Sequence, residues 1–379
     1  MDHKQIAIIG GGLSGLYAAT LLEAQGITNY VLLEARERLG GRIEDFSLKS
    51  GPKVEQFDLG PTWFWPEFQP QLNALIEKLG LQKFPQYDQG KTRIERAPNE
   101  KIVSIQGFTS SLQSMRLKGG MGTLIRALHS RLNNTNILLG NKVHSITKYD
   151  HNIEIRYQDV NQANTIQSIA ADHVFLALSP RLAVESINFI PNLPTEVFEQ
   201  WQKTATWMAP HAKYIAVYDH PFWRKEGLSG DARSAYGPMV EIHDATTSEG
   251  RVALFGFIGI PPNTRQAVGD EQMKVLCRAQ MKRLFGDQAA KPYADIIKDW
   301  AKDPLTSTDL DLHALNDHHH TPEIGVKSGP WQHHLTGIAS EWSVQFPGYI
   351  AGAIEAAYVG VEHYVNNKWS QDDNVCQIR

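Results

Sequence analysis

Cysteine is scarce in this sequence, and charge of one sign is not in excess. The 379 residues contain two cysteines, Cys277 and Cys376, which lie far apart and in no metal-binding or redox spacing. A disulfide framework is therefore not expected, and a reducing cytoplasm is the expected compartment. The formal net charge of −4 gives no electrostatic reason to expect binding to nucleic acid or to an anionic membrane surface.

Long hydrophobic runs are also missing. No apolar stretch approaches the roughly 18 residues that indicate a membrane span. The first expected strand begins at Ile6, which leaves no room for a cleavable signal, so no secretion leader is expected. The sequence shows no repeat of fixed period and no low-complexity tract. Because 379 residues exceed the usual size of a single core, the sequence predicts two domains.

Two kinds of site lack their motifs. His313 and the run His318, His319 and His320 stand in a turn-like stretch without a carboxylate or cysteine at ligand spacing, so no metal site is predicted. No G-x-S-x-G nucleophile elbow occurs, which argues against a Ser/His/Asp hydrolase. A second G-x-G-x-x-G is absent too, so we expect no separate NAD(P)H domain, and electrons would come from the substrate.

The most informative segment is "IAIIGGGLSGLYAATLLEAQGITNYVLLE", residues 6–34. A continuous apolar run, 6–9, is typical of a parallel strand covered on both faces. G-x-G-x-x-G follows at 10–15, then a helical pattern, and then a second expected strand, 30–33, that ends at Glu34. The glycines permit a tight turn and close approach to a pyrophosphate, and Glu34 is placed to accept hydrogen bonds from a ribose diol. The segment predicts a dinucleotide site.

The next residues, "ARERLGGR", favour a flavin over a nicotinamide cofactor. A nicotinamide-binding unit has no need of a second glycine pair and an arginine here, whereas a flavin dinucleotide is longer and lies extended. Gly41 can let the backbone approach the cofactor, and Arg36 and Arg42 can contact ribose or phosphate. The alternative for both arginines is solvated charge on a loop.

Lys213 opens an expected strand, "KYIAVYD", at an unusual place for a charge. Strand alternation puts Lys213, Ile215 and Val217 on one face. An ammonium beside two aliphatic side chains is costly unless it meets water, a carboxylate or a ligand. One interpretation is that Lys213 lies at the strand end and reaches solvent. The other is a buried amine with a function.

From "LLEARERLGGR" onward, the sequence resembles the flavin-containing amine oxidase family, which includes monoamine and polyamine oxidases. Further matches follow in family order along most of the chain: "FDLGPTWFWP" (57–66), "LKGGMGTLIRAL" (117–128), "HVFLALSPRL" (173–182), "YDHPFWR" (218–224) and "GIASEWSVQFPGYIAGAIEAA" (337–357). The resemblance implies a short, soluble, bacterial-type member, because the helical insertion and the C-terminal membrane helix of larger members are missing.

The resemblance implies an α/β fold with a discontinuous Rossmann-like FAD-binding domain and a second, α+β substrate domain with an antiparallel sheet. The expected FAD-binding segments are 1–78, 119–187 and 304–370, and the expected substrate-binding segments are 79–118 and 188–303. The residues that match the family's cofactor-binding positions are Gly10, Gly12, Leu13, Ser14, Gly15, Glu34, Arg36, Gly41, Arg42, Gly60, Pro61, Thr62, Val143, Glu341, Gly348, Tyr349 and Ile350.

The resemblance also implies catalytic positions. Lys213, eight residues before Pro221, matches the lysine that holds a water at the flavin N5, and Tyr349 matches one of two rings that flank the substrate. The position of the second ring is Leu310, so Trp63 or Trp65 would have to replace it, unless both are core residues. The position of the cysteine that links the flavin covalently is an aspartate, which implies non-covalent FAD.

The expected function is FAD-dependent amine oxidation. The amine would transfer a hydride from its α-carbon to the flavin N5, and oxygen would reoxidise the flavin, giving an imine or aldehyde and hydrogen peroxide. One alternative is an FAD-dependent dehydrogenase or desaturase of a larger hydrophobic molecule. The other is a protein that binds FAD without turnover. The sequence indicates neither the substrate nor the oligomeric state.

Overall fold

A computed structural model describes residues 2–50, 53–107, 112–162, 165–248, 250–312 and 321–376. The chain forms two compact units: unit 1 comprises 1–42, 124–207 and 314–379, and unit 2 comprises 43–123 and 208–313. Residues 43–78 thus group with unit 2, whereas the sequence placed them in the FAD-binding domain. Contacts define the units without indicating which residues bind a cofactor, so the functional domain boundaries remain a prediction.

Unit 1 is built on a mixed sheet. Its strand order is β13 (Asn188–Ile190), β10 (Asn141–Lys148), β11 (Ile153–Asp159), β12 (Ile166–Leu176), β1 (His3–Ile9), β2 (Tyr30–Leu33) and β9 (Ile137–Leu138), and β19 (Leu335–Gly337) also pairs with β12. β1 runs parallel to both β12 and β2, with Ile6 opposite Tyr30. All four residues of β2 are buried, as expected for a parallel strand covered on both faces.

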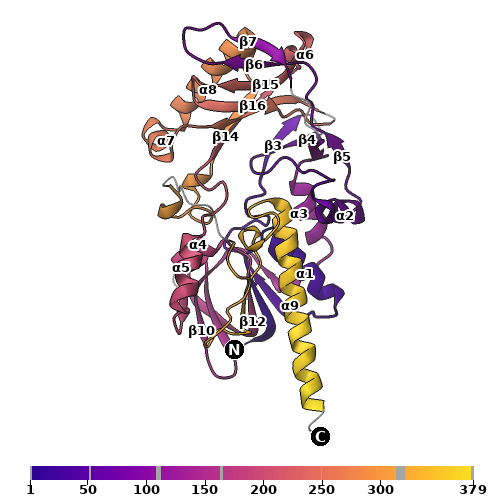
Figure 1. Cartoon of the computed structure of the whole chain (residues 1–379), viewed down its shortest axis with the longest axis vertical. Helices are drawn as coiled ribbons and strands as arrows, with labels where there is room; N and C mark the ends of the chain where they lie inside the picture. Colours follow the sequence, from indigo (N-terminus) through magenta and orange to yellow (C-terminus); the bar gives the residue numbers. More distant parts are fainter. Residues whose placement is uncertain are drawn as a thin grey trace. The chain divides into compact units, whose positions relative to one another are not determined.

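Helices cover the sheet of unit 1. They are α1 (Leu13–Ala24), α4 (Pro180–Ser186), α5 (Thr195–Lys203) and α9 (Ile350–Cys376), with short turns η1 (Asn134–Asn136) and η5 (Ser340–Trp342), while α3 (Gly122–His129) crosses the division between the units. α1 and α9 lie side by side (Figure 1). Among the described residues, none of the helices combines the length and apolar character needed to cross a bilayer.

Unit 2 contains the expected sheet, which is antiparallel apart from one parallel pair of strands. Its strand order is β18 (Ala294–Asp299), β14 (Ala212–Tyr218), β17 (Val252–Ile258), β16 (Met239–Asp244), β15 (Leu228–Ser234), β6 (Lys91–Glu95) and β7 (Val103–Gln106). β14 and β17 pair antiparallel, with Lys213 opposite Phe257. Helix α8 (Asp270–Phe285) packs on one face of this sheet, over Tyr214 and Leu254 (Figure 1).

Unit 2 contains several smaller elements besides this sheet and α8. They are the hairpin β3 (Asp45–Ser50) and β4 (Lys53–Asp58), the pair β5 (Lys83–Pro85) and β8 (Met115–Leu117), α2 (Pro70–Lys78), α6 (Phe222–Lys225), α7 (Pro262–Val268), η2 (Asp287–Ala290), η3 (Trp300–Lys302) and η4 (Asp309–Leu312). The hairpin contributes Phe57 to a second core with Ile215 and Val217 of β14. The predicted face of Lys213 is thus confirmed, because Ile215 and Val217 lie together on the side opposite α8.

Candidate functional site

The glycine turn after β1 has the shape needed to hold a diphosphate. Gly10 has φ +111° and donates its N–H to the Leu33 carbonyl at 2.8 Å. A Cβ on Gly15 would lie 2.0 Å from the carbonyl oxygen of Gly10, so only glycine lets α1 start this close to the strand. Gly12 is the N-cap of α1, and no side chain caps that helix. The first N–H groups of α1 are therefore suited to an anionic ligand.

Glu34 is fixed at the end of β2. Its side chain is 4% exposed, Oε2 accepts the Gly11 N–H at 2.7 Å, and Oε1 accepts the Arg36 N–H at 2.8 Å. Asn141 donates its N–H to the Glu34 carbonyl at 2.8 Å, which brings the start of β10, with the buried Val143, to the same edge. Each carboxylate oxygen has a further lone pair, so Glu34 retains acceptor capacity for a ribose diol.

Arg42, which is partly exposed, and the buried Glu341 form a bidentate ion pair within unit 1. Arg42 Nη1 lies 2.6 Å from Glu341 Oε1, and Nη2 lies 3.0 Å from Oε2. Burial alone would raise the pKa of Glu341, but the charge and hydrogen bonds of Arg42 outweigh burial and hold the pKa below its ordinary value. Both partners also hold Trp207, whose N–H donates to Glu341 Oε1 at 3.2 Å and whose carbonyl accepts from Arg42 at 3.3 Å.

Tyr349 stacks on a ring that the sequence motifs did not indicate. The centroids of Tyr349 and Trp207 are 5.7 Å apart at an interplanar angle of 27°. Gly348 has φ +82°, and a Cβ there would lie 2.4 Å from Cβ and Cγ of Trp207. α9 begins at Ile350, directly after this turn. Trp207 lies in "TATWMAP", which carries no recognisable motif, so its contact with Tyr349 had no signal in the sequence.

Lys213 is buried, which excludes the interpretation that it reaches solvent. The side chain is 3% exposed. Its Nζ donates to the Asp58 carbonyl at 2.7 Å, to the Gly60 carbonyl at 3.1 Å and to Thr62 Oγ1 at 2.7 Å. The Nζ also lies 4.1 Å from the centroid of the Phe255 ring. Burial lowers the pKa of Lys213 to about 7, although the nearby Asp58 acts to raise it.

Asp58 links the lysine to a second buried cation. The Asp58 side chain accepts the Met121 N–H at 2.6 Å. Burial raises the pKa of Asp58 to about 6, against the charges of Arg116 and Lys213, which lower it. Arg116 is 4% exposed and donates to the Thr246 carbonyl at 2.8 Å, and burial lowers its pKa. The loop after β4, which contains Gly60 and Pro61, is therefore held at both of its ends.

The two candidate tryptophans differ in their surroundings. Trp63 donates its Nε1–H to Gln86 at 2.8 Å, packs edge-on against His243 at 4.9 Å, and lies 5.3 Å from Phe255. Because Phe255 also contacts Lys213, the structure brings Trp63 and Lys213 onto one sheet face. Trp65 is half-buried in the turn before α2. The role of either ring toward a substrate remains a prediction.

Other sequence candidates contribute little to the site. Leu310, at the second ring's position, lies in η4 and is 40% exposed. Cys277 is enclosed in the core of unit 2, and burial raises the pKa of its thiol. His313 and His318–His320 lie outside the described residues, and no cluster suited to a metal ion occurs in the part of the chain that the structure describes.

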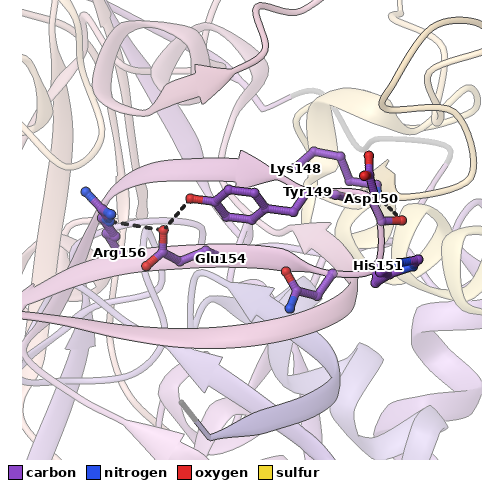
Figure 2. A pocket seen from close by; sticks show the side chains of 7 residues that line it. Lys148, Tyr149, Asp150, His151, Glu154 and Arg156 are labelled. Carbon is purple, nitrogen blue, oxygen red and sulfur yellow. Dashed lines mark hydrogen bonds and ion pairs between the residues drawn. The ribbon is translucent and has the colours of Figure 1, made fainter.

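An open hollow on unit 1 lies at the hairpin that joins β10 and β11 (Figure 2). It is lined by Lys148, Tyr149, Asp150, His151, Asn152, Glu154 and Arg156. Figure 2 shows the carboxylate of Glu154 between the hydroxyl of Tyr149 and the guanidinium of Arg156. Strand pairing aligns this hairpin with Lys4, about 20 Å before Gly10 along β1. The hollow is therefore separate from the glycine turn.

Two family models and two curated proteins show what this chain is similar to. The family model "Flavin containing amine oxidoreductase" matches residues 102–359, and the model "NAD(P)-binding Rossmann-like domain" matches residues 8–79. A probable flavin-containing monoamine oxidase A from Dictyostelium discoideum is 26% identical, over 93% of this chain and 95% of its own length. A putrescine oxidase from Kocuria rosea is 23% identical, over 94% of this chain and 95% of its own length.

Solved structures share the fold. Putrescine oxidase bound to putrescine superposes with a TM-score of 0.79 at 19% identity, covering 96% of this chain and 99% of that chain. Cyclohexylamine oxidase from Brevibacterium oxydans superposes with a TM-score of 0.76 at 18% identity, with coverages of 96% and 99%. At such low identity these structures establish the two-domain α/β architecture and leave the individual site residues to be argued from this chain.

Proposed function

Because this chain belongs to the flavin-containing amine oxidoreductases and is an FAD-dependent amine oxidase, we propose the roles of its residues in that reaction. The family match favours amine oxidation over desaturation of a larger molecule and over cofactor binding without turnover. When bound, FAD would supply the hydride-accepting and oxygen-reducing chemistry that converts an amine and oxygen into an imine and hydrogen peroxide.

Unit 1 would hold the adenosine and diphosphate end of the cofactor. The uncapped start of α1, with Gly12 and Ser14, would bind the diphosphate, and Glu34 would accept the ribose hydroxyls. The close approach of α1 to the strand at Gly15, where any Cβ would collide with the Gly10 carbonyl, and the fixed carboxylate of Glu34 support this assignment. The residues Leu13, Arg36, Gly41, Arg42, Val143, Glu341, Gly348 and Ile350 would complete the cofactor contacts from this unit.

Unit 2 would supply Lys213, whose side chain would act at the flavin end of the cofactor. Its three N–H groups all point at protein oxygens, and the bond to the Gly60 carbonyl, at 3.1 Å, is the longest. We propose that this bond is the one exchanged when Lys213 holds a catalytic water. The carbonyl of Gly60, the ring of Pro61 and the hydroxyl of Thr62 would then line the cofactor beside that water.

We propose that the cofactor is held without a covalent bond. Cys277 is fully buried in the core beside α8 and would have to leave that core to react with a flavin. Denaturation of the yellow protein in acid tests this, because non-covalent FAD is released into the supernatant. Flavin that stays with the precipitated chain contradicts the proposal.

We also propose a cytoplasmic location, since two separated cysteines suit a reducing compartment.

Reduction of the bound flavin by amines tests the function directly. The FAD-loaded protein is mixed anaerobically with a panel of primary and secondary amines, and the flavin absorbance is followed. We expect at least one amine to bleach the flavin, and admission of air to restore the colour with one hydrogen peroxide formed per turnover. A flavin that no amine bleaches would count against amine oxidation. Bleaching without reoxidation in air would count against oxygen as the acceptor.

A further inference from the structure

We infer that Trp207, rather than Trp63 or Trp65, is the second aromatic ring of the substrate site, and that it stacks directly on Tyr349 to form one aromatic wall. This inference rests on the proposed function, which puts Tyr349 beside the substrate. The stack is 5.7 Å between centroids and tilted by 27°. Such a pair is favourable beyond the area that it buries.

The exposure of the pair argues against a purely structural role. Trp207 and Tyr349 are each 40% exposed. A tryptophan that served the core alone would be enclosed, as Trp331 and Trp342 of the same unit are, at 0% exposure each. Two large rings that remain accessible while stacked on each other offer a preformed surface for an apolar ligand.

The surroundings of Trp207 hold its ring in place. Its backbone N–H and carbonyl are bound by Glu341 and Arg42, at 3.2 and 3.3 Å. Gly348 clears the space for this side chain, because a Cβ at position 348 would lie 2.4 Å from both Cβ and Cγ of Trp207. The ring is therefore positioned before any substrate arrives, which is how a specificity surface keeps its binding cost low.

The spacing of the rings determines how a substrate would bind. At 5.7 Å between centroids, no ligand fits between Trp207 and Tyr349. The substrate therefore packs against the pair from one side, instead of being clamped between two facing rings. A one-sided wall recognises the apolar body of the amine by face or edge contact and sets no limit on its thickness. We accordingly infer a preference for amines that carry an aryl or cycloalkyl group.

An amine that cannot react separates binding from turnover. α,α-Dimethylbenzylamine has no hydrogen on its α-carbon, so it can bind but cannot transfer a hydride. tert-Butylamine has the same carbon skeleton around nitrogen with a methyl group in place of the phenyl ring. Affinities of the FAD-loaded protein for both amines are measured by calorimetry and by the change in the flavin spectrum. The expected loss in Trp207→Ala is about tenfold for the aryl amine and less than twofold for tert-butylamine.

Two further variants provide controls. Trp207→Phe keeps a ring and should restore most of the affinity for the aryl amine. Phe198→Ala removes a ring of the same 40% exposure from α5 and should change neither affinity. FAD content should match the wild type in Trp207→Ala, because Arg42 and Glu341 bind the backbone of this residue and not its ring.

Equal affinity of the wild type and Trp207→Ala for the aryl amine would overturn the inference, and so would the absence of measurable binding by the wild type. A uniform loss for both amines would show a general disturbance and would also overturn it. The proposed function fails separately, when no oxidisable amine bleaches the flavin. In that event a selective loss of the aryl amine would still establish the aromatic wall.

Discussion

Replacing Lys213 by methionine tests whether burial makes this side chain lose its proton more easily in the folded protein than in the unfolded chain. Burial lowers its pKa from an ordinary 10.5 to about 7. Between these two pH values the unfolded chain binds a proton at this position that the folded chain does not bind. The free energy of unfolding therefore rises with pH across this window, with a limiting slope of about 1.4 kcal/mol per pH unit. Between pH 8 and 9.5, Lys213 is therefore expected to raise the free energy of unfolding by about 2 kcal/mol.

The variant should lose this contribution to the pH slope. Lys213→Met also leaves three oxygens without their donor, so its absolute stability falls by about 1–3 kcal/mol for each buried acceptor that finds no water. The slope is independent of that loss. Urea unfolding of the FAD-saturated protein at pH 8 and 9.5 gives the slope for both proteins, and we expect the variant to gain about 2 kcal/mol less over this interval.

A lysine on the neighbouring strand provides the control. Lys298 lies opposite Lys213 in the sheet, and its Nζ lies 2.7 Å from Glu44. Lys298→Met removes a cation from the same face without touching the three acceptors, so it should keep the contribution that Lys213 makes to the slope between pH 8 and 9.5. Identical slopes for Lys213→Met and the wild type would refute the reasoning, because Lys213 would then titrate equally in both states.

Two further substitutions test the cofactor-holding part of unit 1. Gly15→Ala puts a Cβ 2.0 Å from the Gly10 carbonyl oxygen, so the purified protein should carry almost no FAD. The ratio of flavin absorbance to protein absorbance measures the FAD content. Full FAD content would contradict the close approach of α1 to the strand. Arg42→Lys replaces the bidentate partner of Glu341 by a point charge, and it should lower the free energy of unfolding by about 2 kcal/mol. Arg36→Lys is the control. An equal loss of stability in Arg36→Lys would mean that the bidentate pair with Glu341 is not the cause of the loss in Arg42→Lys.

Local pattern was sufficient to predict the strands and turns that carry the site. The apolar run before Gly10 and the expected strand at 30–33 both correspond to strands of the structure, β1 and β2. Alternation along β14 placed Lys213 with Ile215 and Val217, and the core around those two residues confirms that face. These features depend on backbone periodicity and on glycine geometry, which a single sequence displays directly.

The pattern of the strand alone left open whether Lys213 is buried, because its acceptors leave no trace in the sequence. Two of them are backbone carbonyls, of Asp58 and Gly60, and any residue type can present a carbonyl. The solvent-exposed interpretation was reasonable on composition alone, since lysines are seldom enclosed. What makes enclosure tolerable is the set of three oxygens together with the Phe255 ring, all of which come from segments distant in sequence.

The pairing of Trp207 with Tyr349 shows a second limit of motif-based prediction. Motifs locate residues that replace one another at aligned positions, and they therefore indicate Leu310 as the position of the missing ring and Trp63 or Trp65 as its replacement. A ring can instead be supplied from an unrelated segment if the backbone leaves space for it. Gly348 leaves that space, since any side chain there would collide with the indole. An alanine at this position would therefore be expected to displace the ring of Trp207 from that of Tyr349.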